Sequence, residues 1–507
     1  MEEGVVVEPI RKESRIMALA IQNTLSGKKD EFQPISAPKV GMYVCGVTVY
    51  DLSHIGHARS AIAFDVIYRY LRFRGFDVTY VRNFTDIDDK IIRRAGELGI
   101  STGELTEKFI GAFKDDMKAL GLLDPSLEPR CTHYVPQMVE FIGQLVEKGF
   151  AYPAANGDVY YRVGNFKGYG KLSGKKLDEL EAGARVEVDD VKESPFDFAL
   201  WKASKPGEPK WPSPWGEGRP GWHIECSVMS YSNLGETLDI HGGGKDLMFP
   251  HHENEIAQSE AYTGKPFAKY WIHNGFVNVP SADNPDGAKM SKSLGNFYTI
   301  RDVLAAYHPE AVKLFMLGTH YRNDILFTED GLSQAQDRLA YFYETLAKAE
   351  AFLATHPVEG GTLLDVDRTS RIVSEFIEAM DDDFNTTKAL GQLSEVFKLI
   401  NELVSDAKLV PADAAFTLAE TLKNLRTVTG ALGFLTLDPK RFEEELKQLR
   451  TGQLGVSAAE IEQLIKERLD ARAQKNWKRA DEIRDLLAAK GILLKDSRDG
   501  TTWSVKS

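Results

Sequence analysis

The sequence predicts an α/β protein in which a parallel sheet is split by an insertion and followed by helices. Residues 39–49 form an apolar run rich in β-branched side chains, which is typical of a buried strand. Residues 57–73 repeat apolar side chains at helical spacing, and residues 76–84 form a second strand-like run. A strand, a helix and a strand within roughly 45 residues indicate a βαβ unit, so we expect a Rossmann-like parallel sheet.

The character of the chain changes twice after this unit. Residues 131–220 hold many turn residues, short strand-like runs and a stretch rich in Pro, Trp and Gly. The α/β pattern returns over 221–300, so we interpret 131–220 as an insertion between two halves of the nucleotide fold. Beyond residue 300 the pattern becomes helical, and Asn385 or Thr386 could cap a helix with a continuous apolar face.

Bulk properties are those of a globular enzyme of three or four domains. The chain has 507 residues, of which 43% are hydrophobic and 27% charged. We find neither a run of about 18 apolar residues nor a signal peptide, so we expect a cytoplasmic protein without a membrane partner. Three cysteines are too few for a disulfide framework. The net charge of −13 means that any nucleic acid must meet a local basic face.

Two short strings point to a nucleotide site. The string His-Ile-Gly-His at 54–57 lies at the predicted strand-to-helix turn, where helix N–H groups suit phosphate. Gly56 lets a backbone approach closely, and His54 and His57 add uncharged donors. The string Lys-Met-Ser-Lys-Ser begins at Lys289, and its second lysine is Lys292. A loop of this kind can close over a triphosphate. Structural histidines and a solvated lysine loop are the alternative, which the co-occurrence of both strings disfavours.

A third element of the nucleotide site is suggested by Gly243, the middle of three consecutive glycines that follow a histidine. Bare backbone at this position could admit an adenine or a ribose. A simple turn explains the glycines equally well.

Four side chains form a candidate metal site. Cys45 ends the first predicted strand, and Cys226 lies in the string Gly-Trp-His-Ile-Glu-Cys. His251 and Glu255 are four residues apart, which would place them on one face if the segment is helical. Two thiolates, an imidazole and a carboxylate suit zinc. On composition alone a ligand could be replaced by His252, Glu253 or His223. The alternative is a pair of small buried thiols beside a solvated acidic helix.

Several longer strings resemble the cysteinyl-tRNA synthetases of bacterial type, a class I aminoacyl-tRNA synthetase family. They include Tyr-Val-Cys-Gly-Val-Thr-Val-Tyr-Asp from residue 43, Arg-Asn-Phe-Thr-Asp-Ile-Asp-Asp-Lys from residue 82, and the strings at 221–226, 239–255 and 289–296. The resemblance extends from about residue 18 to Trp503.

This resemblance implies a ligase that activates L-cysteine with ATP and Mg²⁺ to cysteinyl-adenylate, then transfers it to the 3′-terminal adenosine of tRNA(Cys). It implies one zinc ion held by Cys45, Cys226, His251 and Glu255. Thr85 and Trp222 match positions that line the amino-acid pocket beside Cys45, and Lys292 matches a mobile lysine that contacts ATP. Because a thiol loses its proton on a metal and a serine hydroxyl resists ionising, zinc would select the substrate.

The C-terminal end reverses the charge of the chain. Residues 461–507 hold 11 Lys and Arg against 8 Asp and Glu, a net charge of +3. Stacking side chains, donors and acceptors suit splayed anticodon bases, and the candidates are Arg468, Arg472, Trp477 and Asp481. The alternative is a solvated amphipathic helical tail, and charge alone favours this alternative. The resemblance to the family favours an anticodon-binding module.

With the resemblance, we expect a monomer with this order of segments: an N-terminal extension (1–16), the first half of the catalytic nucleotide-binding domain (17–130), a connective insertion (131–220), the second half (221–300), a stem-contact segment (301–345), a helical bundle (346–436), a linker (437–458) and an anticodon-binding module (459–507). Two rival interpretations are a related ligase that joins cysteine to an amino sugar and a zinc-containing RNA-binding protein without catalysis.

Overall fold

The computed structural model describes residues 18–175, 191–281, 284–289, 297–497 and 500–505. The predicted N-terminal extension (1–16) and Lys292 lie outside these ranges. Within these ranges, no helix combines the length and the apolar character needed to cross a bilayer.

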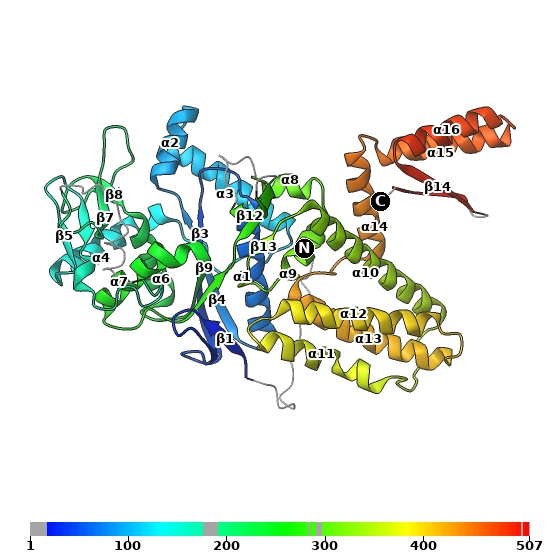
Figure 1. Ribbon diagram of the computed structural model, residues 1–507, viewed down its shortest axis with the longest axis horizontal. Coiled ribbons are helices and arrows are strands. Elements are labelled where there is room, and N and C mark those ends of the chain that lie inside the picture. The colour runs from blue at the N-terminus through cyan, green and yellow to red at the C-terminus, as the bar shows by residue number, and fades with distance from the viewer. Residues whose placement is uncertain (1–17, 176–190, 282–283, 290–296, 498–499, 506–507) are drawn as a thin grey trace.

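A four-stranded parallel sheet forms the centre of the molecule (Figure 1). Its strand order is β10–β9–β3–β4, with bounds Ala268–Asn274, Leu238–Gly244, Lys39–Thr48 and Asp77–Thr85. Helix α1 (Ile55–Phe73) joins β3 to β4, and its first turn is held by a capping box between His54 and His57. The predicted βαβ unit and parallel sheet are therefore confirmed.

The polypeptide between β4 and β9 leaves the sheet and returns to it. It contains the helices α2 (Asp89–Leu98), α3 (Thr102–Ala119) and α4 (Val135–Glu147), then the antiparallel strands β5 (Ala151–Pro153), β6 (Val159–Tyr161), β7 (Phe198–Ala203) and β8 (Gly218–Pro220). Tyr161 and Trp201 fill the core beneath these strands. Helix α6 (Trp222–Leu234) leads back to β9, and α7 (Glu253–Thr263) lies between β9 and β10.

Smaller sheets flank the central one. They consist of β1 (Ala20–Asn23) with β2 (Lys28–Glu31), and of β11 (Val277–Ser281) with β12 (Asn284–Lys289) and β13 (Ile325–Leu326). Residues 297–300 lie beside the start of α1, because Ile55 N–H donates to Tyr298 O at 3.1 Å and Ile300 N–H donates to Ser53 O at 2.9 Å. The segment that follows the lysine string is thus fixed to the turn that carries the two histidines.

Helices dominate the second half of the chain. Their bounds are α8 (Ile300–Leu304), α9 (Pro309–Leu317), α10 (Glu329–Thr355), α11 (Val366–Asp381), α12 (Thr386–Ser405), α13 (Pro411–Leu432) and α14 (Pro439–Gln453). Asn385 caps α12, as its sequence predicts, because its Oδ1 accepts from Lys388 N–H at 3.0 Å. The bundle shares one apolar core with α1, where Tyr70 also donates to Asp381 at 2.6 Å.

The stretch 437–458 differs from the expected linker, since most of it is helix α14. Asp438 caps this helix through Lys440 N–H at 2.9 Å. Phe442 and Leu446, spaced by four, are buried in the main core. Charged residues on the other face make the stretch polar on average, so the apolar pair does not stand out in the sequence.

A small module ends the chain at the far end of the molecule from the insertion (Figure 1). It consists of α15 (Ala458–Ala473), α16 (Trp477–Ala489) and the hairpin of β14 (Ile492–Ser497) with β15 (Gly500–Val505). A separate apolar cluster holds it together, and its buried members include Ile461, Ile465, Ile483 and Leu487.

Candidate active site and metal centre

A register shift in β3 exposes the first thiol to the site. The pairing of β3 with β4 is interrupted between Val44 and Val47, so that Cys45 and Gly46 leave the regular ladder. Gly46 N–H donates to Asn83 Oδ1 at 2.8 Å. A Cβ atom on Gly46 would lie 1.6 Å from the Asn83 carbonyl oxygen, so only glycine fits between these strands.

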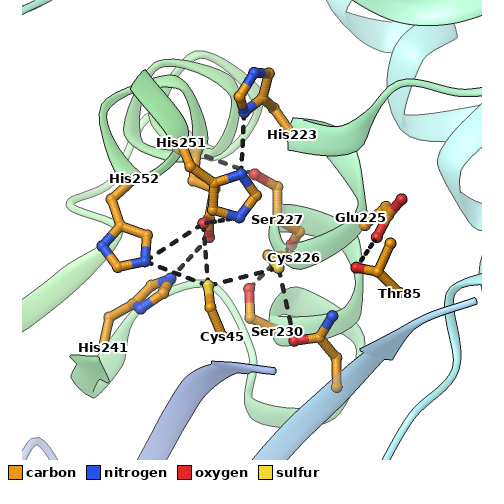
Figure 2. A network of polar contacts seen from close by, with 12 residues as sticks. Cys45, Thr85, His223, Glu225, Cys226, Ser227, Ser230, His241, His251 and His252 are labelled. Carbon is orange, nitrogen blue, oxygen red and sulfur yellow. Dashed lines mark hydrogen bonds and ion pairs between the residues drawn. The ribbon is translucent and has the colours of Figure 1, made fainter. Parts of the chain in front are cut away.

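Four side chains from three parts of the sequence meet beside this shift (Figure 2). The Cys45 sulfur lies 3.6 Å from the Cys226 sulfur and 3.4 Å from Glu255 Oε1. His251 Nε2 lies 3.0 Å from the same carboxylate oxygen. Cys226 comes from α6, His251 from a short π-helical turn (Met248–His252), and Glu255 from the first turn of α7. The two sulfurs are too far apart for a disulfide and are close enough to share one metal ion.

A second set shares Cys45 and Glu255 and replaces the other two groups with His241 and His252. This set lies deeper, because neither histidine lines the neighbouring cavity, whereas Cys45, Cys226 and His251 do. His241 Nε2 lies 2.7 Å from Glu255 Oε2, the arrangement by which an outer group orients a metal-binding carboxylate. The geometry therefore favours the set with two thiols.

Glu253 and His223, which composition alone would also allow as ligands, have different roles. Glu253 accepts from the backbone N–H of Ser173 at 2.9 Å, so it holds the insertion against α7. His251 contacts Glu255 through its Nε2 atom. His223 Nδ1 lies 3.0 Å from the other ring nitrogen of His251, Nδ1, so His223 contacts a candidate ligand and not the centre of the cluster.

The electrostatics of the cluster fit a bound cation. Burial opposes ionisation, but hydrogen bonds from Cys45 and His251 lower the pKa of Cys226 to about 6. Burial and the Cys226 sulfur raise the pKa of Cys45 well above its usual value. Burial also opposes ionisation of Glu255, yet His241 and His251 hold its pKa well below the usual range. The ionised Glu255 and the lowered pKa of Cys226 place negative charge here that a divalent metal would neutralise, and Cys45 would lose its proton on binding that metal.

A cavity of about 360 Å³ joins this cluster to the start of α1. At the metal end it is lined by Thr85 and Trp222 as well as by the cluster. The Trp222 ring stacks on His251 with centroids 4.3 Å apart. At the other end it is lined by Gly56 and His57. One cavity therefore brings the amino-acid and nucleotide candidates of the sequence together.

The histidine string forms the cap of α1 and differs in one respect from expectation. His54 Nδ1 accepts from Gly56 N–H at 3.1 Å, and His57 N–H donates to His54 O at 2.9 Å. These two N–H groups are therefore engaged and do not offer themselves to phosphate. Burial and the neighbouring His54 lower the pKa of His57 to about 3, so its ring is an uncharged donor or acceptor.

In the glycine triplet after His241, the residue that lines the cavity is Gly244 and not the predicted Gly243. A Cβ on Gly243 would lie 3.0 Å from both His252 and Leu247, so a larger residue there would crowd these two side chains. Lys289 ends β12 and its backbone pairs with Asn278, while Lys292 lies outside the described residues.

The C-terminal candidates separate into two kinds. Arg468 is 7% exposed, and both of its terminal nitrogens lie 2.9 Å from Asp496, so its guanidinium joins α15 to the hairpin instead of facing bases. Arg472 contacts the same carboxylate at 2.6 Å. Trp477 is 59% exposed at the start of α16, and Asp481 forms an exposed ion pair with Arg484. Arg468 therefore has a structural contact within the module, and the four anticodon assignments stay predictions.

Sequence reasoning missed two residues of the site. His241 orients Glu255, and its one local signal is its position before the glycine triplet. Glu225 accepts from Thr85 Oγ1 at 2.7 Å across 140 positions of sequence, which no local pattern could indicate.

Comparisons with known proteins identify the families that match this chain. The family model described as "tRNA synthetases class I (C) catalytic domain" matches residues 31–337. The DALR domain matches residues 375–436, and the "Cysteinyl-tRNA ligase anticodon binding domain" matches residues 457–503.

Similar proteins cover almost the whole chain. A cysteine–tRNA ligase of Geobacter metallireducens is 54% identical over 498 residues, which is 97% of this chain and 100% of that protein. One of Stutzerimonas stutzeri is 54% identical over 488 residues, covering 96% and 99%. The solved Mycobacterium tuberculosis methionyl-tRNA synthetase in complex with methionyl-adenylate covers 83% of this chain and 94% of that one, with a TM-score of 0.59 at 16% identity, and shares the fold. The chain therefore belongs to the cysteine–tRNA ligase family of class I aminoacyl-tRNA synthetases.

Proposed function

We propose that this cysteine–tRNA ligase recognises L-cysteine through a zinc ion held by Cys45, Cys226, His251 and Glu255. The observation that carries the proposal is that the two thiols and His251 line the same cavity as the turn at 54–57. The amino acid and ATP, with its Mg²⁺, would therefore meet in one cavity. The substrates implied by the family are L-cysteine, ATP and tRNA(Cys).

Selection between cysteine and serine requires more than size, because the two differ by one atom. Differences of that kind in an apolar pocket contribute only about 1–3 kcal/mol. When bound, zinc would ligate a thiolate in preference to a hydroxyl, since a thiol with a pKa of about 8.5 ionises readily on a soft metal. The protein supplies the buried ligands and the shape of the cavity. Such recognition makes a separate editing domain unnecessary.

The adenylation step is the one that membership of the family implies. The carboxylate of cysteine attacks the α-phosphorus of ATP, cysteinyl-adenylate forms, and pyrophosphate leaves. Protein groups position the reactants and stabilise charge. His54 and His57 are candidates at the nucleotide end, and because His57 Nδ1 accepts from His54 N–H, the other ring nitrogen of His57 can donate to a phosphate oxygen. We propose that Lys289 and Lys292 stabilise the negative charge that develops as pyrophosphate departs.

Transfer to tRNA uses a hydroxyl of the terminal adenosine, which attacks the mixed anhydride and releases AMP. We propose that the C-terminal module reads the anticodon with the exposed Trp477 among its contacts, because an aromatic face supports base stacking. The solvent-facing Arg472 and Asp481 remain candidates for polar contacts. We further propose that the enzyme is a cytoplasmic monomer.

Removal of single ligands tests this proposal. Cys226→Ser and His251→Ala should lose zinc and cysteine-dependent pyrophosphate exchange. Cys131→Ala provides a matched control, because Cys131 is a fully buried thiol that neither lines the cavity nor belongs to the cluster, and it should retain zinc. Full exchange activity in a metal-free Cys226→Ser protein would contradict zinc recognition.

Acceptor choice tests the ligase against its relative that uses an amino sugar. Cysteine-dependent consumption of ATP should require tRNA and should not respond to an amino-sugar acceptor. Consumption that follows the amino sugar would favour the relative, and the absence of pyrophosphate exchange would favour a non-catalytic RNA-binding protein.

A further inference from the structure

Glu225 is a buried carboxyl group to which neither the metal cluster nor the nucleotide end assigns a role. It lies in the first turn of α6, between the cavity residue Trp222 and the thiol of Cys226. It is 1% exposed, and its Oε2 accepts from Thr85 Oγ1 at 2.7 Å (Figure 2). A polar group buried to this degree is costly unless it is hydrogen-bonded, so the contact with Thr85 is energetically significant.

Thr85 occupies the other side of this contact, at the end of β4, and it lines the cavity beside Cys45 and Trp222. A threonine hydroxyl has one hydrogen to donate and two lone pairs that accept. Since the hydrogen is directed to Glu225, the hydroxyl has only acceptor lone pairs left for a ligand in the cavity. An acceptor fixed in this way discriminates between ligand groups that donate and those that only accept.

Cysteine has one group that suits such an acceptor. Its sulfur is the atom recognised at the metal cluster, and its carboxylate is the nucleophile that attacks ATP. The remaining polar group is the α-ammonium, which only donates. We infer that Glu225 is a positioning residue: by accepting the hydroxyl hydrogen of Thr85, it fixes that oxygen as the acceptor for the α-ammonium group of the substrate. The inference rests on the proposed function, since it assumes that cysteine occupies this cavity.

The inference predicts a loss in substrate binding more than in chemistry. Without an acceptor at position 225, the Thr85 hydrogen can turn towards the cavity, where it opposes the ammonium group. The hydrogen bond at stake involves a charged partner, so the KM for cysteine should rise roughly 10- to 100-fold. The value of kcat should change by less than about threefold, because the interaction is present equally in the ground state and the transition state.

A double-mutant cycle measures whether Glu225 acts through Thr85. The variants are Glu225→Met, which keeps the volume without an acceptor, Thr85→Val, which removes the hydroxyl, and the combination of both. Glu225→Gln retains an acceptor oxygen and should recover most of the KM of the wild type. The measured quantities are kcat and KM for cysteine in pyrophosphate exchange, together with the zinc content of each protein.

A matched control lies at Asp86, the next residue along the chain from Thr85. Thr132 Oγ1 donates to Asp86 Oδ2 at 2.6 Å, and neither of these residues lines the cavity. Thr132→Val therefore removes a similar hydroxyl–carboxylate hydrogen bond without touching the amino-acid end of the site. It should leave the KM for cysteine unchanged.

The inference expects Glu225→Met and Thr85→Val to raise KM to a similar extent, with Glu225→Met adding nothing in the Thr85→Val background. It is overturned if Glu225→Met has the KM of the wild type, if the two effects multiply in the double variant, or if Thr132→Val raises KM equally. Wild-type protein without cysteine-dependent exchange would instead refute the proposed function, so the two failures are distinguishable.

A second comparison guards against loss of folding in Glu225→Met. Glu225→Asp keeps the carboxyl group but withdraws the acceptor by one methylene, and it should raise KM in the same direction. The inhibitor 3-mercaptopropionate has the thiol and carboxylate of cysteine without its amino group, so its inhibition constant should be the same for wild type and Thr85→Val. An inhibition constant that rises as much as the KM for cysteine would overturn the assignment of the ammonium group.

Discussion

Gly46→Ala tests whether the register shift in β3 builds the metal site. The added methyl group would lie 1.6 Å from the carbonyl oxygen of Asn83, whereas real Cβ contacts essentially never fall below 3.0 Å. The obstacle is backbone of the neighbouring strand and cannot rotate away. The strands must therefore separate by more than an ångström beside Cys45.

The expected consequence for metal binding is much larger than the consequence for folding. Overpacking of this kind costs about 1–3 kcal/mol of folding free energy, which a protein of this size tolerates. Metal–ligand distances, in contrast, are held to about 0.2 Å. A displacement of Cys45 that is several times larger should remove one ligand from the cluster and so abolish stoichiometric zinc binding.

Gly41→Ala is a matched control in the same strand. A Cβ there would lie 3.6 Å from its nearest neighbour, Leu234, which is ordinary van der Waals contact. We expect Gly41→Ala to retain zinc and pyrophosphate exchange, and Gly46→Ala to lose both while still unfolding cooperatively. Metal analysis of the purified proteins, thermal unfolding and exchange assays measure these outcomes. A Gly46→Ala protein with one zinc per chain and normal exchange would refute the reasoning.

Four further substitutions test the metal site, the C-terminal module and the lysine string. His241→Ala should weaken zinc binding about 10- to 100-fold, measured by competition with a chelator, because Glu255 loses its 2.7 Å partner; an unchanged affinity would assign His241 to packing alone. Arg468→Ala should lower the free energy of unfolding of the C-terminal module by about 1–3 kcal/mol. Trp477→Ala should change the free energy of unfolding by less than about 0.5 kcal/mol and weaken tRNA binding by about 1–3 kcal/mol. Denaturant titrations and tRNA-binding assays measure these two quantities. Loss of stability in Trp477→Ala together with loss of tRNA binding alone in Arg468→Ala would contradict both assignments. Lys292→Ala should slow adenylate formation in single-turnover measurements far more than it weakens cysteine binding, and an unchanged rate would remove its proposed role.

Local patterns predict the elements of the fold that carry local signals. The βαβ unit at 39–84 follows from apolar periodicity, and the cap at Asn385 follows from side-chain chemistry at a helix start. The sequence gives little sign of helix α14, because only a few of its residues, including Phe442 and Leu446, are buried and the rest of the stretch is charged. Periodicity is weak where few side chains are buried.

The site depends on information that local patterns do not contain. Cys45 and Cys226 are 181 positions apart, so residue types alone leave the choice of ligands open, and the resemblance to a family narrows it to the four ligands of the proposed zinc site. Composition cannot predict the bidentate contact of Arg468 with Asp496, because an arginine in a basic module is equally typical of a base-reading group. The sequence likewise points to Gly243, whereas Gly244 lines the cavity. Gly243 instead packs beside His252, and a local pattern of three glycines does not show this difference.

The central claim is that the enzyme recognises its amino acid by ligating sulfur at the Cys45–Cys226 cluster. Pyrophosphate exchange with cysteine and with serine, measured on protein of known zinc content, tests it most directly. We predict exchange with cysteine that rises in proportion to bound zinc, and negligible exchange with serine at every zinc content. Equal exchange with the two amino acids by fully zinc-loaded protein would contradict the claim.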